Sequence, residues 1–112
     1  MNRPDIIFVV LDTQRADRLG CYGRQKAITP NIDQFAQKGT LFTQAVSPAQ
    51  WTIPSHASFF TGLYPTVHQV TQSDHSLSPE LPHLAETLRD SGYQTVGFCN
   101  NPLVGILNNG FK

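Results

Sequence analysis

Residues 51–65 of this chain read Trp51-Thr52-Ile53-Pro54-Ser55-His56-Ala57-Ser58-Phe59-Phe60-Thr61-Gly62-Leu63-Tyr64-Pro65. The order of residue types predicts a loop that runs into a helix. Pro54 has a fixed φ and no N–H, which suits the first position of a helix, and it disfavours helical backbone at the preceding residue. We therefore expect a helix that begins at Pro54 and leaves Thr52 just outside its N-terminus.

The hydroxyl of Thr52 is expected in the positive field of that helix N-terminus. Unpaired backbone N–H groups in such a position can hold an anion, for example a phosphate or sulfate ester. Thr52 is therefore a candidate nucleophile. The simpler alternative is that its side chain only caps the helix.

Composition narrows the range of functions. The chain has 112 residues, with eight Lys plus Arg balanced by eight Asp plus Glu. This balance gives no net field, so neither nucleic acid nor a membrane surface is expected as a partner. The apolar run of residues 6–11 is too short for a signal peptide or a membrane span, and a cytoplasmic location is expected. Cys21 and Cys99 are too few for a disulfide framework and are expected to be reduced and structural.

Three segments are predicted as strands. Residues 6–11 form a continuous apolar run rich in β-branched side chains, typical of a buried strand in a parallel sheet, and residues 40–46 and 93–99 follow as further strands. Ligands collect beyond the carboxyl ends of parallel strands. Asp12, which ends the first strand, is therefore placed to hold a metal or a polar substrate, or else serves as a turn residue. Asn100 is expected on the same side, after the last strand.

Helices are predicted between these strands. Thr29-Pro30 opens one helix that ends at Gly39, and Pro82 opens another that ends at Gly92. The resulting order β, α, β, α, loop, α, β implies an α/β sandwich with a largely parallel sheet. We expect a single domain.

Two polar stretches offer further candidate residues. Arg15 either contacts an anion or pairs with Asp17 or Asp33. Residues 66–78 are polar and rich in turn residues, so they are predicted as a surface loop. His68 and His75 are expected to be solvated there, since neither has a partner at a helical ligand spacing.

Three parts of the chain share a specific order and spacing. They are Ile6-Ile7-Phe8-Val9-Val10-Leu11-Asp12-Thr13-Gln14-Arg15-Ala16-Asp17 with Leu19-Gly20-Cys21-Tyr22-Gly23, then Thr29-Pro30-Asn31-Ile32-Asp33, and then Pro54-Ser55-His56 through Thr61-Gly62-Leu63-Tyr64-Pro65. Together they resemble the N-terminal part of the sulfatase family, within the alkaline phosphatase superfamily. The similarity extends through residues 84–95 and covers nearly the whole chain.

The resemblance implies that residues 1–112 are the N-terminal part of an alkaline phosphatase-like α/β domain, a partial three-layer sandwich with a mostly parallel sheet, incomplete at the C-terminus. It also implies a divalent metal ion (Zn, Mn, Ca or Mg) and a nucleophile that attacks sulfur or phosphorus of a small-molecule ester. Carried over, Asp12 matches a metal ligand, and Thr52 matches the nucleophile and a metal contact. His56 or Asn100 is placed to hydrogen-bond an ester oxygen, and Arg15 to contact the anion.

Several positions depart from the family pattern. Sulfatases have Cys or Ser at the position of Thr52, which is oxidised to formylglycine, and Arg at the position of His56. A Thr does not give this aldehyde because its β-carbon carries a methyl group, so no formylglycine is expected. A directly acting Thr is similar to the phosphodiesterase and phosphoglycerol-transferase branches, where a phosphothreonine forms. Thr13 stands in place of a second metal-binding Asp, and Gln69 in place of a Gly.

The resemblance implies further metal ligands beyond residue 112. We therefore expect this chain to carry part of the site and to be inactive when isolated, with a missing C-terminal region or an oligomer completing the sheet. The predicted function is a sulfatase-like, metal-dependent hydrolase or transferase of phosphoric or sulfuric esters that acts through Thr52. The alternative is a non-catalytic, truncated α/β module with at most weak anion binding.

Overall fold

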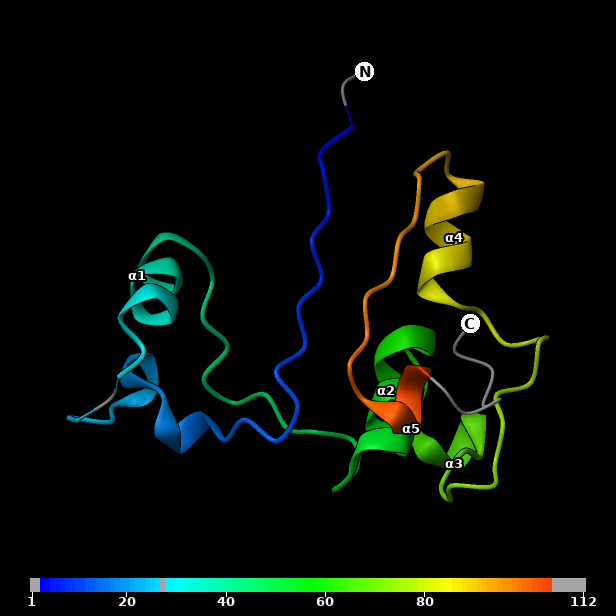
Figure 1. The fold of residues 1–112 in the computed structure, drawn as a ribbon, viewed down its shortest axis with the longest axis horizontal. Helices are drawn as coiled ribbons and strands as arrows, with labels where there is room; N and C mark the ends of the chain where they lie inside the picture. The colour runs from blue at the N-terminus through cyan, green and yellow to red at the C-terminus, as the bar shows by residue number, and fades with distance from the viewer. Residues whose placement is uncertain (1–2, 27, 106–112) are drawn as a thin grey trace. The chain divides into compact units, whose positions relative to one another are not determined.

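The computed structural model describes residues 3–26 and 28–105, which fall into two compact units, one within residues 1–45 and one within residues 46–112. All regular elements in this part of the chain are helical (Figure 1). The first unit contains the 3-10 helices η1 (Ala16–Arg18) and η2 (Gly20–Tyr22) and the helix α1 (Pro30–Lys38). The second contains α2 (Thr52–Thr61), α3 (Pro65–His68), α4 (Leu84–Asp90) and α5 (Pro102–Gly105). None of these helices is long and apolar enough to cross a membrane.

Asp33 joins η2 to α1 in the first unit. Its carboxylate accepts a hydrogen bond from the backbone N–H of Cys21 at 2.7 Å and from the Thr29 hydroxyl at 3.2 Å. The same hydroxyl oxygen accepts from the backbone N–H of Gly20 at 3.2 Å. A Cβ at Gly20 would clash with the Asp33 carboxylate, so a larger residue there would require this carboxylate to shift. Cys21 is a free thiol, as expected.

The helix α2 is the central element of the second unit and contacts α3, α4 and α5. Its residues Ile53 and Ala57, one turn apart, have no exposed surface. They form the core of this unit with Val70 and Leu77. Complete burial of an Ile or Val side chain stabilises a fold by about 1.5–3 kcal/mol, so this small cluster accounts for much of what holds α2 in place.

The start of α2 differs from the prediction by two residues. The helix begins at Thr52 instead of Pro54, and the N–H of Ser55 closes the first turn by donating to the Trp51 carbonyl at 3.3 Å. Pro54 still lies in the first turn, where N–H groups have no acceptor inside the helix, so its missing N–H removes no helical hydrogen bond. The expectation that Thr52 lies outside the helix is therefore wrong.

The other two predicted helices are present. The bounds of α1 are those predicted. The helix α4 begins two residues after Pro82, because Nδ1 of His83 accepts a hydrogen bond from the backbone N–H of Ala85 at 3.3 Å and so caps the N-terminus. Gly92 has a φ of 85°, as expected for a left-handed stop.

The predicted sheet is wrong for the part of the chain that the structure describes. Residues 6–11, 40–46 and 93–99 form no strand there, so the structure has no partial three-layer sandwich and no parallel sheet. Ile7, in the run expected to be buried, has 86% of its surface accessible, and Phe98, in the last predicted strand, has 97% accessible. Apolar, β-branched runs favour extended backbone, but a strand also needs a neighbouring backbone that supplies ladder hydrogen bonds, and short-range pattern does not specify that neighbour.

Gln69 follows α3 with a left-handed φ of 59°, at the position where the resemblance places Gly. A side chain in this conformation costs roughly 1–2 kcal/mol. We predict that Gln69→Gly raises the free energy of unfolding by up to about 1 kcal/mol, since the gain from lost strain exceeds the added entropy of the unfolded chain. Urea denaturation measures this change.

The matched control for this variant is Gln72→Gly. Gln72 is also exposed, but its φ is not positive, so a glycine there only adds unfolded-state entropy. Its free energy of unfolding should stay level or fall. If Gln69→Gly and Gln72→Gly lowered the free energy of unfolding equally, the backbone at Gln69 would not be strained.

Candidate active site

The candidate active site lies in the N-terminal half of α2. Thr52 is half-buried at the start of the helix, and His56 follows one turn later with 8% of its surface exposed. Nδ1 of His56 lies 2.8 Å from the Thr52 carbonyl oxygen. Because a carbonyl only accepts hydrogen bonds, the neutral imidazole must carry its proton on Nδ1, which leaves Nε2 as an acceptor. Residues four apart share one face of a helix, so both side chains project from the same side of α2.

Two aromatic side chains flank the His56 ring. The ring centroid of Phe59 lies 5.7 Å from that of His56, and the centroid of Phe60 lies 6.3 Å away, both in tilted arrangements. Tilted ring pairs at these separations are favourable and restrict the rotamers of both partners. The imidazole is thus oriented by the Thr52 carbonyl and by its aromatic neighbours.

A pair of serines fixes the loop that enters α2. The Ser55 hydroxyl donates to the Ala49 carbonyl at 3.0 Å, and the Ser47 hydroxyl donates to the same oxygen at 2.6 Å. The two hydroxyl oxygens lie 3.2 Å apart, and Ser55 is buried. The loop immediately before Thr52 is therefore tied to the helix that carries Thr52.

His68 is a residue whose environment the sequence analysis missed. It was expected to be solvated in a surface loop, yet it ends α3 with only 4% of its surface exposed. Its Nδ1 accepts a hydrogen bond from the Val70 backbone N–H at 3.0 Å, and its Nε2 lies 3.0 Å from Oγ of Ser58. The neutral ring therefore carries its proton on Nε2 and donates to Ser58. Pro65, at the first position of a short helix, is the sequence signal that could have indicated this structure.

The other predicted site residues are exposed. Asp12 and Arg15 belong to the first unit and Asn100 to the second. The guanidinium of Arg15 donates to both carboxylate oxygens of Asp17, at 2.9 and 2.7 Å, and this hydrogen bonding holds the pKa of Asp17 below its usual value. The pairing that the sequence offered as an alternative for Arg15 is thus present. Metal or substrate contacts by Asp12, Arg15 and Asn100 stay predictions.

Thr13 is strained at the position where the resemblance places a second metal-binding Asp. Its φ is 60°, in the left-handed region that β-branched side chains rarely occupy. Such a conformation costs on the order of 1–3 kcal/mol. Asp tolerates this region better than Thr does, so the backbone here suits the family's residue more than the one present.

The described residues do not by themselves complete a metal site. Divalent ions in catalytic sites are held by several carboxylate, imidazole or thiolate ligands. Over residues 3–26 and 28–105, no three or more His, Cys, Asp or Glu side chains are grouped so that they could hold an ion. The predicted metal contacts of Asp12 and Thr52 therefore stay predictions.

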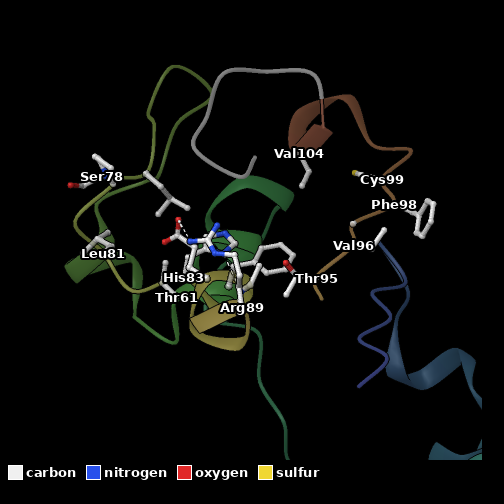
Figure 2. A pocket seen from close by; sticks show the side chains of 16 residues that line it. Thr61, Ser78, Leu81, His83, Arg89, Thr95, Val96, Phe98, Cys99 and Val104 are labelled. Atoms are coloured by element: carbon white, nitrogen blue, oxygen red, sulfur yellow. Dashed lines mark hydrogen bonds and ion pairs between the residues drawn. The ribbon is translucent and has the colours of Figure 1, made fainter. Parts of the chain in front are cut away.

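A cavity of about 800 Å³ lies beside α2 and α4. Figure 2 shows His83 and Arg89 near its centre and residues 95–99 along another side. Nε2 of His83 is buried and has no hydrogen-bond partner among the described residues. Neither Thr52 nor His56 lines this cavity, so it does not belong to the candidate active site.

Comparison with known proteins gives consistent matches. The sequence model of the sulfatase family matches residues 4–111. Human steryl-sulfatase is 32% identical over 128 residues, a match that covers 91% of this chain and 22% of that protein. The ulvan-active sulfatase of Formosa agariphila is 32% identical over 94 residues, covering 84% of this chain and 19% of that protein. No solved structure matches the chain significantly.

These relatives are hydrolases, so the chain is related to this class of enzymes. More specifically, the chain belongs to the sulfatase family, as its sequence predicts. It spans about a fifth of the length of the steryl-sulfatase and of the ulvan-active sulfatase. Members of this family generally use a divalent metal ion.

Burial lowers the pKa of His68, with a hydrogen bond to the Pro54 backbone acting in the opposite direction. In the unfolded chain the ring has a pKa of about 6.5 and binds a proton more readily than in the folded protein. We predict that stability is complete above about pH 6.5 and falls as the pH decreases below it, by at most about 1.4 kcal/mol per pH unit for this one group.

The measurement compares denaturation of the wild type and of His68→Asn between pH 7 and pH 5. The Asn side chain keeps an acceptor for the Val70 N–H but does not titrate. Its stability should therefore depend less on pH than that of the wild type. Identical slopes in the two proteins would contradict the assignment to His68.

Proposed function

We propose that the protein is an ester hydrolase, or a transferase, of the sulfatase family that uses Thr52 as its nucleophile on small-molecule sulfuric or phosphoric esters. The observation that carries this proposal is the pairing of Thr52 with His56 in α2. The His56 Nδ1–H is held by the Thr52 carbonyl at 2.8 Å, so the lone pair of the neutral ring is on Nε2. A hydroxyl at a helix N-terminus thus has a proton acceptor on its own helix face.

The proposed reaction has two steps. In the first, Oγ1 of Thr52 attacks sulfur or phosphorus, the bond to the ester oxygen breaks, and the alcohol leaves. His56 Nε2 accepts the hydroxyl proton, directly or through one water, and returns it to the leaving oxygen. In the second step, water or an acceptor alcohol attacks the same sulfur or phosphorus, and the bond to Oγ1 of Thr52 breaks. The proton of the attacking group passes through His56 Nε2 to Oγ1, which restores the free hydroxyl and releases sulfate, phosphate or the new ester.

Two observations bear on the ester. The relatives are named sulfatases, which supports sulfate esters. Thr52 stands where the family has the Cys or Ser that becomes formylglycine, and a directly acting hydroxyl supports phosphate ester chemistry. We keep both esters in the proposal. We also keep Asp12 as one ligand of a divalent ion whose other ligands are not among the described residues.

A non-catalytic module is the second candidate. It is favoured by the finding that the described residues bring no three metal-ligating side chains together. A titration with Zn²⁺, Mn²⁺ or Ca²⁺ and an assay with nitrophenyl esters separate the two candidates. Catalysis requires both binding and turnover, whereas the module shows no turnover in any arm.

Removal of the Thr52 hydroxyl tests the nucleophile. We expect Thr52→Ala, in the complete gene product, to lower kcat/KM by more than about a thousandfold, because loss of a nucleophile removes the covalent route. Circular dichroism should show an unchanged fold. Thr52→Ser keeps a hydroxyl and should retain measurable turnover. Unchanged turnover in Thr52→Ala would sink the assignment.

Nitrophenyl sulfate, nitrophenyl phosphate and bis(nitrophenyl) phosphate should be assayed in parallel. The substrate with the highest kcat/KM identifies the ester.

The variant His56→Asn distinguishes the role of Nε2 of the imidazole from that of Nδ1. The Asn amide nitrogen can take the place of Nδ1 and donate to the Thr52 carbonyl, but no group replaces Nε2. We expect kcat to fall by about 10²–10⁴-fold, the usual contribution of a proton-transfer group, with little change in stability. A decrease of less than tenfold would show that His56 only supports the helix.

A further inference from the structure

The hydrogen bonds of His68 have no part in the proposed chemistry. They connect α2 with the segment that follows α3. Nε2–H of His68 donates to Ser58 in the middle of α2, and Nδ1 accepts from Val70, which lies after α3. Both histidine and serine are buried, with 4% and 8% of their surfaces exposed. One ring thus links the middle of α2 to the residue that follows α3 and packs on the core of this unit.

The tautomer excludes a catalytic Ser–His pair at this place. To activate Ser58, Nε2 of His68 would have to accept the serine proton. The Val70 N–H instead occupies the lone pair of Nδ1, so the proton of the neutral ring is on Nε2 and points to Ser58. The pair therefore has a geometric role and not a chemical one.

We propose that His68 and Ser58 are positioning residues for Thr52: their hydrogen bond fixes the rotation of α2 about its own axis. This inference rests on the function proposed above. Successive residues of a helix are turned by about 100°, so residues four apart share a face and residues two apart lie nearly opposite. Pro54 and Ser58 accordingly form the His68 face, and Thr52 and His56 lie on the opposite side of the helix.

Besides the hydrogen bond from Ser55 to the Ala49 carbonyl, contacts on two adjacent faces of α2 oppose its rotation. Ile53 and Ala57 pack on Val70 from one face, and the bond from His68 to Ser58 holds an adjacent face, turned by about 100°. Apolar packing alone is non-directional and tolerates small rolling movements. A roll of about 15° moves a side-chain atom about 4 Å from the helix axis by roughly 1 Å, which is enough to lower a rate about a hundredfold.

Three variants test this role by activity in the complete gene product. Ser58→Ala removes the acceptor, and His68→Asn removes the donor while it keeps an acceptor for the Val70 N–H. Both should lower kcat by about 10–100-fold with KM within about threefold, since the nucleophile and not the substrate is displaced. His68→Gln places an amide donor near the position of Nε2 and should restore most of kcat.

The matched control is Thr61→Val at the far end of α2. It removes a hydroxyl that donates to the Ala57 carbonyl at 2.6 Å and accepts from the Leu63 N–H at 3.2 Å, so it also deletes side-chain hydrogen bonds of the same helix. Its kcat should stay within about twofold of the wild type at a temperature where every variant is folded by circular dichroism. Equal kcat values for Ser58→Ala and Thr61→Val would overturn the proposal. If Ser58→Ala does not fold, the kcat of His68→Asn is compared with that of Thr61→Val, and equal values would again overturn the proposal.

A spectroscopic readout separates this inference from the proposed function. Long-range ¹H–¹⁵N correlation of the histidine rings at pH 8 should show His68 as the Nε2–H tautomer and His56 as the Nδ1–H tautomer. A Nδ1–H tautomer for His68 overturns the positioning role whatever the activity. The expected tautomers without any turnover in the wild type overturn the proposed function and, with it, the role of His68 in positioning.

Discussion

The second unit depends on the burial of α2, in which residues 53–58 are all buried. Ile53 and Ala57 lie against Val70 and Leu77 in an apolar cluster, and Thr52 and His56 belong to the same helix. The cluster sets where α2 lies, while hydrogen bonds set how it is turned and where it begins. Hydrophobic burial is strong and non-directional, so it determines the position of α2. Hydrogen bonds are weaker and directional, so they determine the rotation of the helix and with it the direction of Thr52.

The sequence predicted those helices whose ends are encoded locally. Pro30 and Gly39 bracket α1, and Gly92 takes the left-handed conformation that its position after a helix indicates. The start of α2 was misplaced because Pro is accepted throughout a first turn and so marks a helix start only to within a few residues. The strands were wrongly predicted because an apolar run favours extended backbone but does not specify which other strand pairs with it.

The candidate site, like the fold, could be predicted from the sequence only in part. Thr52 could be selected from its place just before Pro54 and from the family resemblance, and His56 from that resemblance, and their chemical roles stay predictions. The proton positions on the two rings could not be foreseen, because each depends on which backbone group lies 2.8–3.0 Å from a particular nitrogen. His68 was misjudged for the same reason: a polar neighbourhood in sequence concealed a partner, Ser58, that lies ten residues away along the chain.

The exposed apolar run of residues 6–11 has a consequence for handling the protein. Six consecutive apolar residues without charge or proline, five of them at least half exposed, match the composition of segments that stack between molecules into fibrils. Asp5 and Asp12 stand directly at its two ends. Charged residues that flank such a segment act as gatekeepers against self-association. Asp12 thereby has a colloidal role beside any catalytic one, and its replacement by a neutral residue changes solubility as well as chemistry.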